Sequence, residues 1–262
     1  MPTVTENLSV WNEKYDWSKQ GDEWTRNAAG TEAYWKRVIY PRISRFLPTG
    51  TILEIAPGYG RWTQFLKDHC QRMLVADLAP RCIEHCRQRF SGESHISYFI
   101  NDGYSLPDVA NQSVDFAFSF DSLVHAERDV IEAYVHELAR ILRPTGVAFL
   151  HHSNIGHYHR RLAVCGLFPG ILNNLVGRLL AINVGAWRAP SMTADLMQRF
   201  VREAKLSCVS QELISWAHGR CMVDTISLIC RPGSTWDGGT VIIENRSFAR
   251  DVGRILREAA SS

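Results

Sequence analysis

The fold is decided by residues 51–62, whose sequence is T-I-L-E-I-A-P-G-Y-G-R-W. The first half of this stretch, with Thr51, Ile52, Leu53 and Ile55, suits a buried strand, which Glu54 interrupts. Pro57, Gly58 and Gly60 then predict a tight turn, because glycine adopts positive φ and lets a ligand come close to the backbone. The next residues have the spacing of a helix. This order places a ligand at a helix N-terminus, at the carboxyl end of a parallel strand.

Three further strands are predicted, at residues 72–78, 96–100 and 114–120. Each ends in or is followed by an acid, which is Asp77, Asp102 or Asp121. Asp77 lies 17 residues beyond Gly60, close to the distance at which an acid holds a ribose diol. The four strands therefore present polar or glycine residues along one edge of the predicted sheet.

Residues 51–232, with these motifs in this order, resemble the class I S-adenosylmethionine-dependent methyltransferases. The resemblance implies an α/β fold: a Rossmann-like, seven-stranded, mostly parallel sheet with helices on both faces and a helical lid insertion. It also implies S-adenosyl-L-methionine as cofactor and S-adenosyl-L-homocysteine as product. By position, the implied cofactor-binding residues are Glu54, Ala56, Gly58, Gly60, Arg61, Asp77, Leu78, Asp102, Gly103, Phe120 and Asp121.

The family assigns a different part of the cofactor to each of these motifs. The loop after the first strand holds the methionine end, the acid after the second binds the ribose hydroxyls, and the acid after the third reaches the adenine amino group. Asp77 and Asp102 stand at the latter two positions. Ala56 stands where the family usually has the first of three glycines, and we keep the assignment because alanine is a small change.

A dinucleotide-dependent dehydrogenase is the main alternative for the glycine turn. Its pattern has a third glycine and binds a pyrophosphate on bare backbone N–H groups. Here Arg61 and Trp62 follow Gly60, and no third glycine follows. S-Adenosylmethionine has no phosphate but needs an acceptor for its ammonium group and a donor for its carboxylate. An acid on the first strand and a nearby arginine suit it better.

Composition indicates an ordinary globular protein of 262 residues, either one large domain or one domain with a lid. The formal net charge of +2 does not favour nucleic acid as a partner. The seven cysteines form no paired pattern, and neither a signal peptide nor a long apolar run is evident. We therefore expect no transmembrane segment and a cytoplasmic location. A homodimer is left open.

We expect five segments in the chain. They are an N-terminal helical flap (1–50), the cofactor-binding core (51–153), a helical lid insertion over the acceptor pocket (154–191), the C-terminal part of the core sheet (192–232) and a strand and helix extension (233–262). The flap holds Trp11, Tyr15, Trp17 and Trp24, which either pack on the core surface or close over the ligand through cation–π attraction. The extension carries an apolar helical face, with Phe248, Val252, Ile255 and Leu256.

Methyl transfer is an in-line displacement, and a hydroxyl acceptor needs a base to take its proton. The candidate catalytic residues are His125, His152, Asp121 and His151, at the ends of the strands 114–120 and 147–151. Cys82, His85 and Cys86 share one helical face, but structural zinc takes four ligands, so we predict no metal. His157 and His159 extend the histidine cluster without changing that prediction.

Three short sequences narrow the resemblance further: F-S-F-D-S-L-V-H-A-E, H-H-S-N and G-D-E-W. They are similar to those of bacterial methyltransferases associated with cell-surface glycans and their lipid-linked precursors. The expected acceptor is then a sugar hydroxyl of a small molecule or glycan, and peripheral contact with a lipid-linked substrate is left open. Two alternatives remain: an N-methyltransferase acting on a small amine or natural product, and a non-catalytic S-adenosylmethionine-binding protein.

Overall fold

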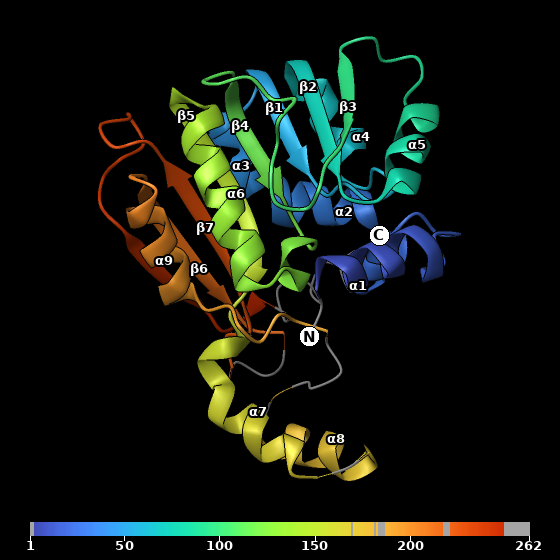
Figure 1. Ribbon diagram of the computed structural model, residues 1–262, viewed down its shortest axis with the longest axis vertical. Helices are drawn as coiled ribbons and strands as arrows, with labels where there is room; N and C mark the ends of the chain where they lie inside the picture. Colours follow the sequence, from blue (N-terminus) through green and yellow to red (C-terminus); the bar gives the residue numbers. More distant parts are fainter. Residues whose placement is uncertain (1–2, 169, 181, 183–186, 217–220, 249–262) are drawn as a thin grey trace.

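The computed structural model describes residues 3–168, 170–180, 182, 187–216 and 221–248 (Figure 1). One sheet runs through these residues in the order β3-β2-β1-β4-β5-β7-β6-β8. Its strands are β1 (Thr49–Ile55), β2 (Cys70–Asp77), β3 (Ile96–Ile100), β4 (Val114–Ser119), β5 (Leu142–Ser153), β6 (Ser207–Ile214), β7 (Asp224–Cys230) and β8 (Val241–Asn245).

The five strands from β1 to β5 pair in parallel, and β7 lies antiparallel between β5 and β6. Because parallel strands point the same way, the carboxyl ends of β1, β2 and β4 lie at one edge. The predicted Rossmann-like, mostly parallel sheet is confirmed. It has eight strands in the described part of the chain rather than seven, since β8 adds in parallel to β6.

Helices cover both faces of the sheet, as predicted (Figure 1). Their bounds are α1 (Val4–Ser9), α2 (Thr31–Tyr34), α3 (Tyr40–Ile43), α4 (Thr63–Leu66), α5 (Pro80–Arg89), α6 (Arg128–Ile141), α7 (His159–Gly166), α8 (Gly170–Leu179) and α9 (Ala194–Glu203). Shorter 3₁₀ turns lie at Asp22–Ala28, Ser44–Phe46, Lys67–His69, Leu123–His125 and Ile155–Tyr158, and π turns at Val10–Lys14 and Trp35–Ile39.

The two faces of β1 enter different cores, because successive side chains of a strand point to opposite faces. Ile52 packs with α2, α3 and α5, whereas Leu53 packs with α6 and α9. The helical stretch from Thr31 to Phe46 forms in pieces. A wider turn at Trp35–Ile39 precedes Pro41, which has no N–H to donate.

Two segments lie outside this layered body. Residues 3–24 lie against the edge formed by the carboxyl ends of the strands, and α7 and α8 project beyond the same edge (Figure 1). No helix among the described residues is long and apolar enough to cross a membrane. The predicted C-terminal helix with Val252, Ile255 and Leu256 lies outside the described residues.

Candidate functional site

A pocket lies at the carboxyl ends of β1, β2 and β4. Its core side is formed by the turn after β1, by the end of β2 and by the residues that follow β4. Its outer side is formed by residues between Val4 and Trp24 of the N-terminal segment. Residues far apart in the sequence therefore face one another across this pocket.

The turn after β1 carries three residues with positive φ: Ala56 at 57°, Gly58 at 58° and Gly60 at 81°. A Cβ on Gly58 would lie 2.6 Å from the ring of Trp17, so this glycine admits the N-terminal segment to the pocket wall. A Cβ on Gly60 would lie 2.6 Å from the ring of Phe90. Gly60 therefore makes room for core packing. It was predicted to bind the cofactor, but it is not among the residues that line the pocket.

Asp77 lies at the end of β2 and lines the pocket, as the sequence suggested. Its carboxylate accepts hydrogen bonds from the backbone N–H of Gly58 (3.1 Å) and of Ala79 (2.8 Å). Burial raises the pKa of Asp77 to about 6, despite these two donors. The carboxylate thus changes charge close to neutral pH, and Leu78 lines the pocket beside it.

Arg61 and Asp121 form an ion pair in the pocket wall, with Nη2 and Oδ2 2.8 Å apart. The guanidinium group of Arg61 lies over the rings of Trp24 and Trp62, at 4.9 and 4.5 Å from their centroids. Burial would raise the pKa of Asp121, but Arg61 and His151 hold it well below its usual range. Both residues were predicted at this site, and they offer a charged donor and a charged acceptor side by side.

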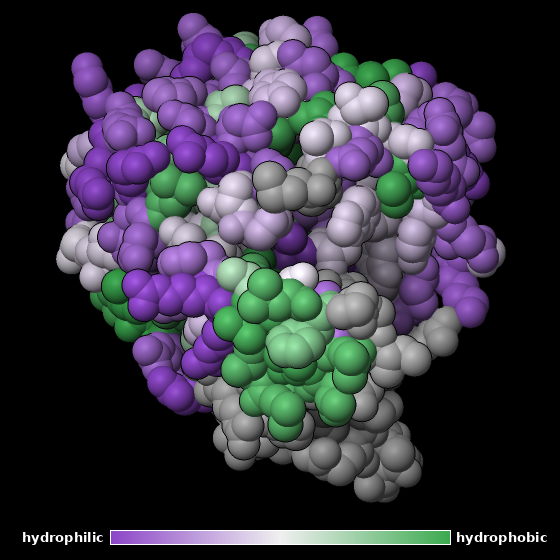
Figure 2. Space-filling model, turned by 60° about the horizontal axis from the view of Figure 1, so that its bottom comes forward, coloured by the Kyte–Doolittle hydropathy of each residue, from purple (hydrophilic) through white to green (hydrophobic). Residues whose placement is uncertain are grey.

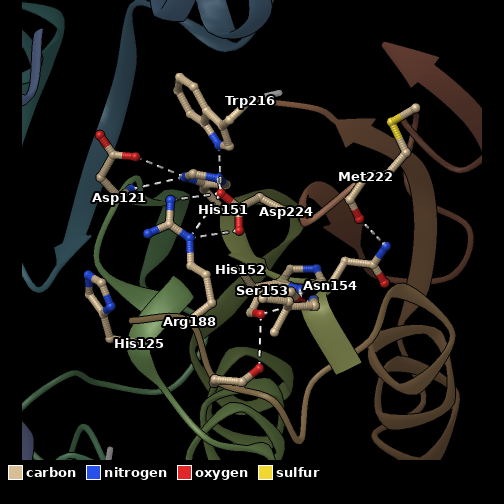
Figure 3. Close-up of polar contacts among 12 residues, drawn as sticks. Asp121, His125, His151, His152, Ser153, Asn154, Arg188, Trp216, Met222 and Asp224 are labelled. Carbon is tan, nitrogen blue, oxygen red and sulfur yellow. Dashed lines mark hydrogen bonds and ion pairs between the residues drawn. The ribbon is translucent and has the colours of Figure 1, made fainter. Parts of the chain in front are cut away.

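His151 belongs to a buried ionic network behind the pocket (Figure 3). Its Nδ1 lies 3.3 Å from Oδ1 of Asp121 and its Nε2 lies 3.5 Å from Oδ2 of Asp224. Asp224 also accepts from Arg188 at 2.9 Å and from the indole N–H of Trp216 at 2.7 Å. Burial would lower the pKa of His151, but the two carboxylates raise it. His151 therefore stabilises Asp121 from behind and does not line the pocket.

The prediction of His152 as a catalytic residue is corrected, because its side chain is fully buried away from the pocket. Its Nε2 lies 2.8 Å from the hydroxyl of Ser227, and its Nδ1 lies 3.0 Å from the carbonyl oxygen of Ser153. Burial lowers the pKa of His152 to about 4. Neighbouring residues on β5 point to opposite faces, so His151 and His152 cannot both face one site.

Of the three candidate histidines, His125 is the one that lines the pocket. Its Nδ1 contacts the carbonyl oxygen of Trp187, which requires the proton on Nδ1 and leaves a lone pair on Nε2. The ring lies 5.4 Å from the ring of Trp11 and 4.9 Å from that of Trp187. Burial lowers the pKa of His125 to about 4. The imidazole is therefore neutral at physiological pH.

Glu54 and Asp102, which were predicted to bind the cofactor, are not among the residues that line the pocket. Glu54 is buried and accepts from the hydroxyl of Thr63 at 2.6 Å, and burial raises its pKa to about 8. Asp102 is exposed, and its carboxylate accepts from the backbone N–H of Tyr104 (2.8 Å) and of Ser105 (2.6 Å). An aspartate after a strand often closes such a turn on itself. Gly103 lines the pocket in its place.

The remaining predicted cofactor residues, Ala56 and Phe120, both line the pocket. Sequence reasoning missed several other lining residues: Val4, Asn7, Gln20, Ser122, Leu123, Val130 and Tyr134. Tyr134 accepts a hydrogen bond from the side-chain amide of Asn101 at 2.8 Å, which ties α6 to the end of β3.

The N-terminal aromatic residues contribute both to the pocket and to packing on the core. Trp11, Trp17 and Trp24 line the pocket, and Trp17 stacks on Tyr59 with ring centroids 4.6 Å apart. Tyr15 packs against these rings, 4.7 Å from that of Trp17, without lining the pocket. The segment therefore forms a wall of the pocket as well as packing on the core.

Across the described residues, no group of three or more histidine, cysteine, aspartate or glutamate side chains could hold a metal ion. Cys82, His85 and Cys86, which share one face of α5, make packing and hydrogen-bond contacts instead. The ring of His85 stacks on Tyr59 at 3.7 Å, and the thiol of Cys86 lies 3.3 Å from the carbonyl oxygen of Gly58.

Comparison with known proteins agrees with this architecture. The family profile described as "Methyltransferase domain" matches residues 52–146. Nodulation protein S of Sinorhizobium fredii is 33% identical over 106 residues, which cover 38% of this chain and 45% of that protein. The chain thus spans less than half the length of this curated relative.

Two solved structures show the fold at low sequence identity. The N-methyltransferase NodS of Bradyrhizobium japonicum, in complex with S-adenosyl-L-homocysteine, has a TM-score of 0.53 at 18% identity, over 87% of this chain and 98% of that one. An S-adenosylmethionine-dependent methyltransferase of Leishmania major has a TM-score of 0.58 at 11% identity, over 86% and 82% of the two chains. The chain therefore has the class I fold of S-adenosylmethionine-dependent methyltransferases, and its residues 52–146 match the methyltransferase-domain profile.

Proposed function

We propose that this protein transfers a methyl group from S-adenosylmethionine to a hydroxyl group of a sugar, in a small molecule or a glycan precursor. The observation that carries the proposal is His125, a neutral imidazole in the pocket wall whose Nδ1 is fixed by a backbone carbonyl. A hydroxyl acceptor needs such a proton acceptor, because it carries almost no negative charge at neutral pH.

The pocket residues fit the cofactor that the fold implies. Asp77 offers a carboxylate to the ribose hydroxyls, and Arg61 offers a guanidinium group to the methionine carboxylate. Asp121, beside Arg61, offers an acceptor to the ammonium group. When bound, S-adenosylmethionine supplies a methyl group on a positively charged sulfur.

The tryptophans of the outer wall suit that positive charge. An aromatic face attracts a cation within about 6 Å of its centroid, most strongly when water is excluded. Trp11, Trp17 and Trp24 provide three such rings on one side of the pocket. Their further role is to exclude water from the displacement. By closing one side of the pocket, they also help to hold the reacting groups in line.

In this proposal His125 removes the acceptor proton through Nε2 during attack. The Nδ1 contact with the Trp187 carbonyl fixes the ring, so the lone pair keeps its direction. Because the pKa of His125 is about 4, the ring stays unprotonated and available at neutral pH. Trp187 belongs to the predicted lid, residues 154–191, and this contact supports a role for that segment in the acceptor pocket.

The test is His125→Gln, with His136→Gln on the exposed face of α6 as the matched control. Methyl transfer is measured with labelled S-adenosylmethionine and a panel of sugar and amine acceptors. We expect kcat to fall about 10²-fold or more for the hydroxyl acceptor. Affinity for S-adenosyl-L-homocysteine should stay within about twofold, since the cofactor contacts assigned above do not include His125.

Transfer to nitrogen is the second candidate, and two observations favour it. The relative in complex with S-adenosyl-L-homocysteine is an N-methyltransferase. A base with a pKa of about 4 also gives a hydroxyl limited help, whereas a neutral amine attacks without a base. An unchanged kcat in His125→Gln, with the label recovered on an amine, would establish this alternative. Cofactor binding without transfer to any acceptor would instead support a binding protein.

A further inference from the structure

The α7–α8 hairpin carries an apolar face that points into solvent. Leu167 is 77% exposed and Leu179 is 72% exposed, values far above those of leucines in a protein core. The other exposed members of this face are Val164, Phe168, Leu172 and Leu175. Figure 2 shows hydrophobic side chains gathered over this end of the molecule.

This face is additional to the packing that holds the hairpin in place. Cys165 on α7 is fully buried, and Gly177 on α8 is buried as well. Arg161 donates to the carbonyl oxygen of Leu180 at 3.0 Å, which ties the two helices together. The exposed leucines of α8 recur at positions 172, 175 and 179, so one side of the helix is inward and the other apolar side is outward.

The charge of the segment is one-sided. Residues 154–191 contain four arginines and two histidines but no aspartate or glutamate, although the chain has 27 acids. His157, His159 and Arg160 are exposed at the start of the hairpin. Of the four arginines, Arg160 is exposed, whereas Arg188 pairs with the buried Asp224. An apolar face beside an exposed arginine, in a segment without acids, is typical of helices that lie in the interface of an anionic membrane.

We propose that the α7–α8 hairpin docks on the surface of an anionic lipid bilayer, with its leucine face in the boundary between headgroups and acyl chains. The hairpin does not span the bilayer, because α8 has only 10 residues. A second copy of this chain fits the face less well, since a two-fold interface would bring the same cationic segments together. The hairpin projects beyond the edge that carries the pocket, so docking would turn that edge towards the membrane (Figure 1).

The experiment is flotation of the full chain with lipid vesicles. One set of vesicles contains phosphatidylcholine alone, and the other contains phosphatidylcholine with phosphatidylglycerol. The double variant Leu167→Ser/Leu179→Ser removes the two most exposed leucines. Ile242→Ser is the matched control, because Ile242 is 57% exposed on β8, outside the hairpin.

We expect the unchanged protein and Ile242→Ser to float with the anionic vesicles, and to float less as salt rises. The double variant should partition about tenfold less. S-Adenosyl-L-homocysteine binding by each variant checks the fold without depending on activity. The proposal is overturned if the unchanged protein stays in solution with both vesicles, or if the double variant floats equally well. A concentration-dependent dimer that the double variant loses, without flotation, would assign the face to a second copy. Since flotation needs no turnover, its outcome is separate from that of the proposed methyl transfer.

Discussion

Cofactor affinity should depend on pH through Asp77. Burial raises the pKa of this carboxyl to about 6, although Gly58 and Ala79 donate to it. Ribose hydroxyls donate most strongly to the ionised carboxylate, so binding favours the deprotonated form. Affinity should therefore be full above pH 7 and fall as the pH drops through about 6.

The size of the effect follows from the fraction ionised. One pH unit below the pKa, about one carboxyl in eleven is ionised, so affinity falls about tenfold, or about 1.4 kcal/mol. Asp77→Asn should lose about 1–3 kcal/mol of binding free energy at neutral pH. The variant should also lose the pH dependence, because an amide does not titrate in this range.

Calorimetric titration with S-adenosyl-L-homocysteine between pH 5 and pH 7, at about half-unit steps, measures both effects. Asp102→Asn is the matched control, since this acid is exposed and does not line the pocket. Glu54, with a pKa of about 8, stays protonated over most of this range. The reasoning is refuted if affinity stays level across the range, or if Asp102→Asn reproduces the loss that we assign to Asp77.

Three predictions concern stability and can be checked by urea denaturation. Ala56→Gly should raise the free energy of unfolding by up to about 1 kcal/mol, because alanine is strained at a φ of 57°; a lower midpoint would contradict this. Gly60→Ala should cost about 2 kcal/mol or more, since its Cβ would lie 2.6 Å from the ring of Phe90; a change within about 0.5 kcal/mol would mean that the ring moves aside freely. Asp224→Asn should cost about 3–5 kcal/mol by leaving Arg188 buried beside a neutral group, and an unchanged midpoint would exclude an energetic role for the ionic network.

Local sequence predicted those parts of the site that depend on strand ends and turns. Asp77 ends one predominantly apolar strand and Gly58 follows another, so their place at the sheet edge could be deduced. Asp102 has the same kind of position but closes its own turn. Which of these two outcomes an acid adopts depends on nearby backbone donors, and spacing alone does not reveal them.

Side-chain direction and long-range packing were harder to deduce. His151 and His152 are neighbours on β5, and the period of a strand shows that they face opposite ways, but not that both are buried away from the pocket lining. The three wall tryptophans are distant in sequence from the β1 turn, and no periodicity connects the two segments. The ring of His125 is held by its Nδ1 contact with the carbonyl oxygen of Trp187, which is 62 residues away in the sequence.

The position of Trp17 against Gly58 bears on how this protein is divided into modules. The stretch that similarity recognises, residues 52–146, supplies the floor of the pocket, whereas Val4, Trp11 and Trp17 supply its roof. A fragment cut at the limits of sequence similarity would keep the residues proposed to hold the cofactor, but it would lack the outer wall of the pocket and expose them to solvent. The unit that natural selection or an engineer can exchange is therefore larger than the recognised domain. Transplanting this pocket into a relative would require the N-terminal residues up to Trp24 to move with it.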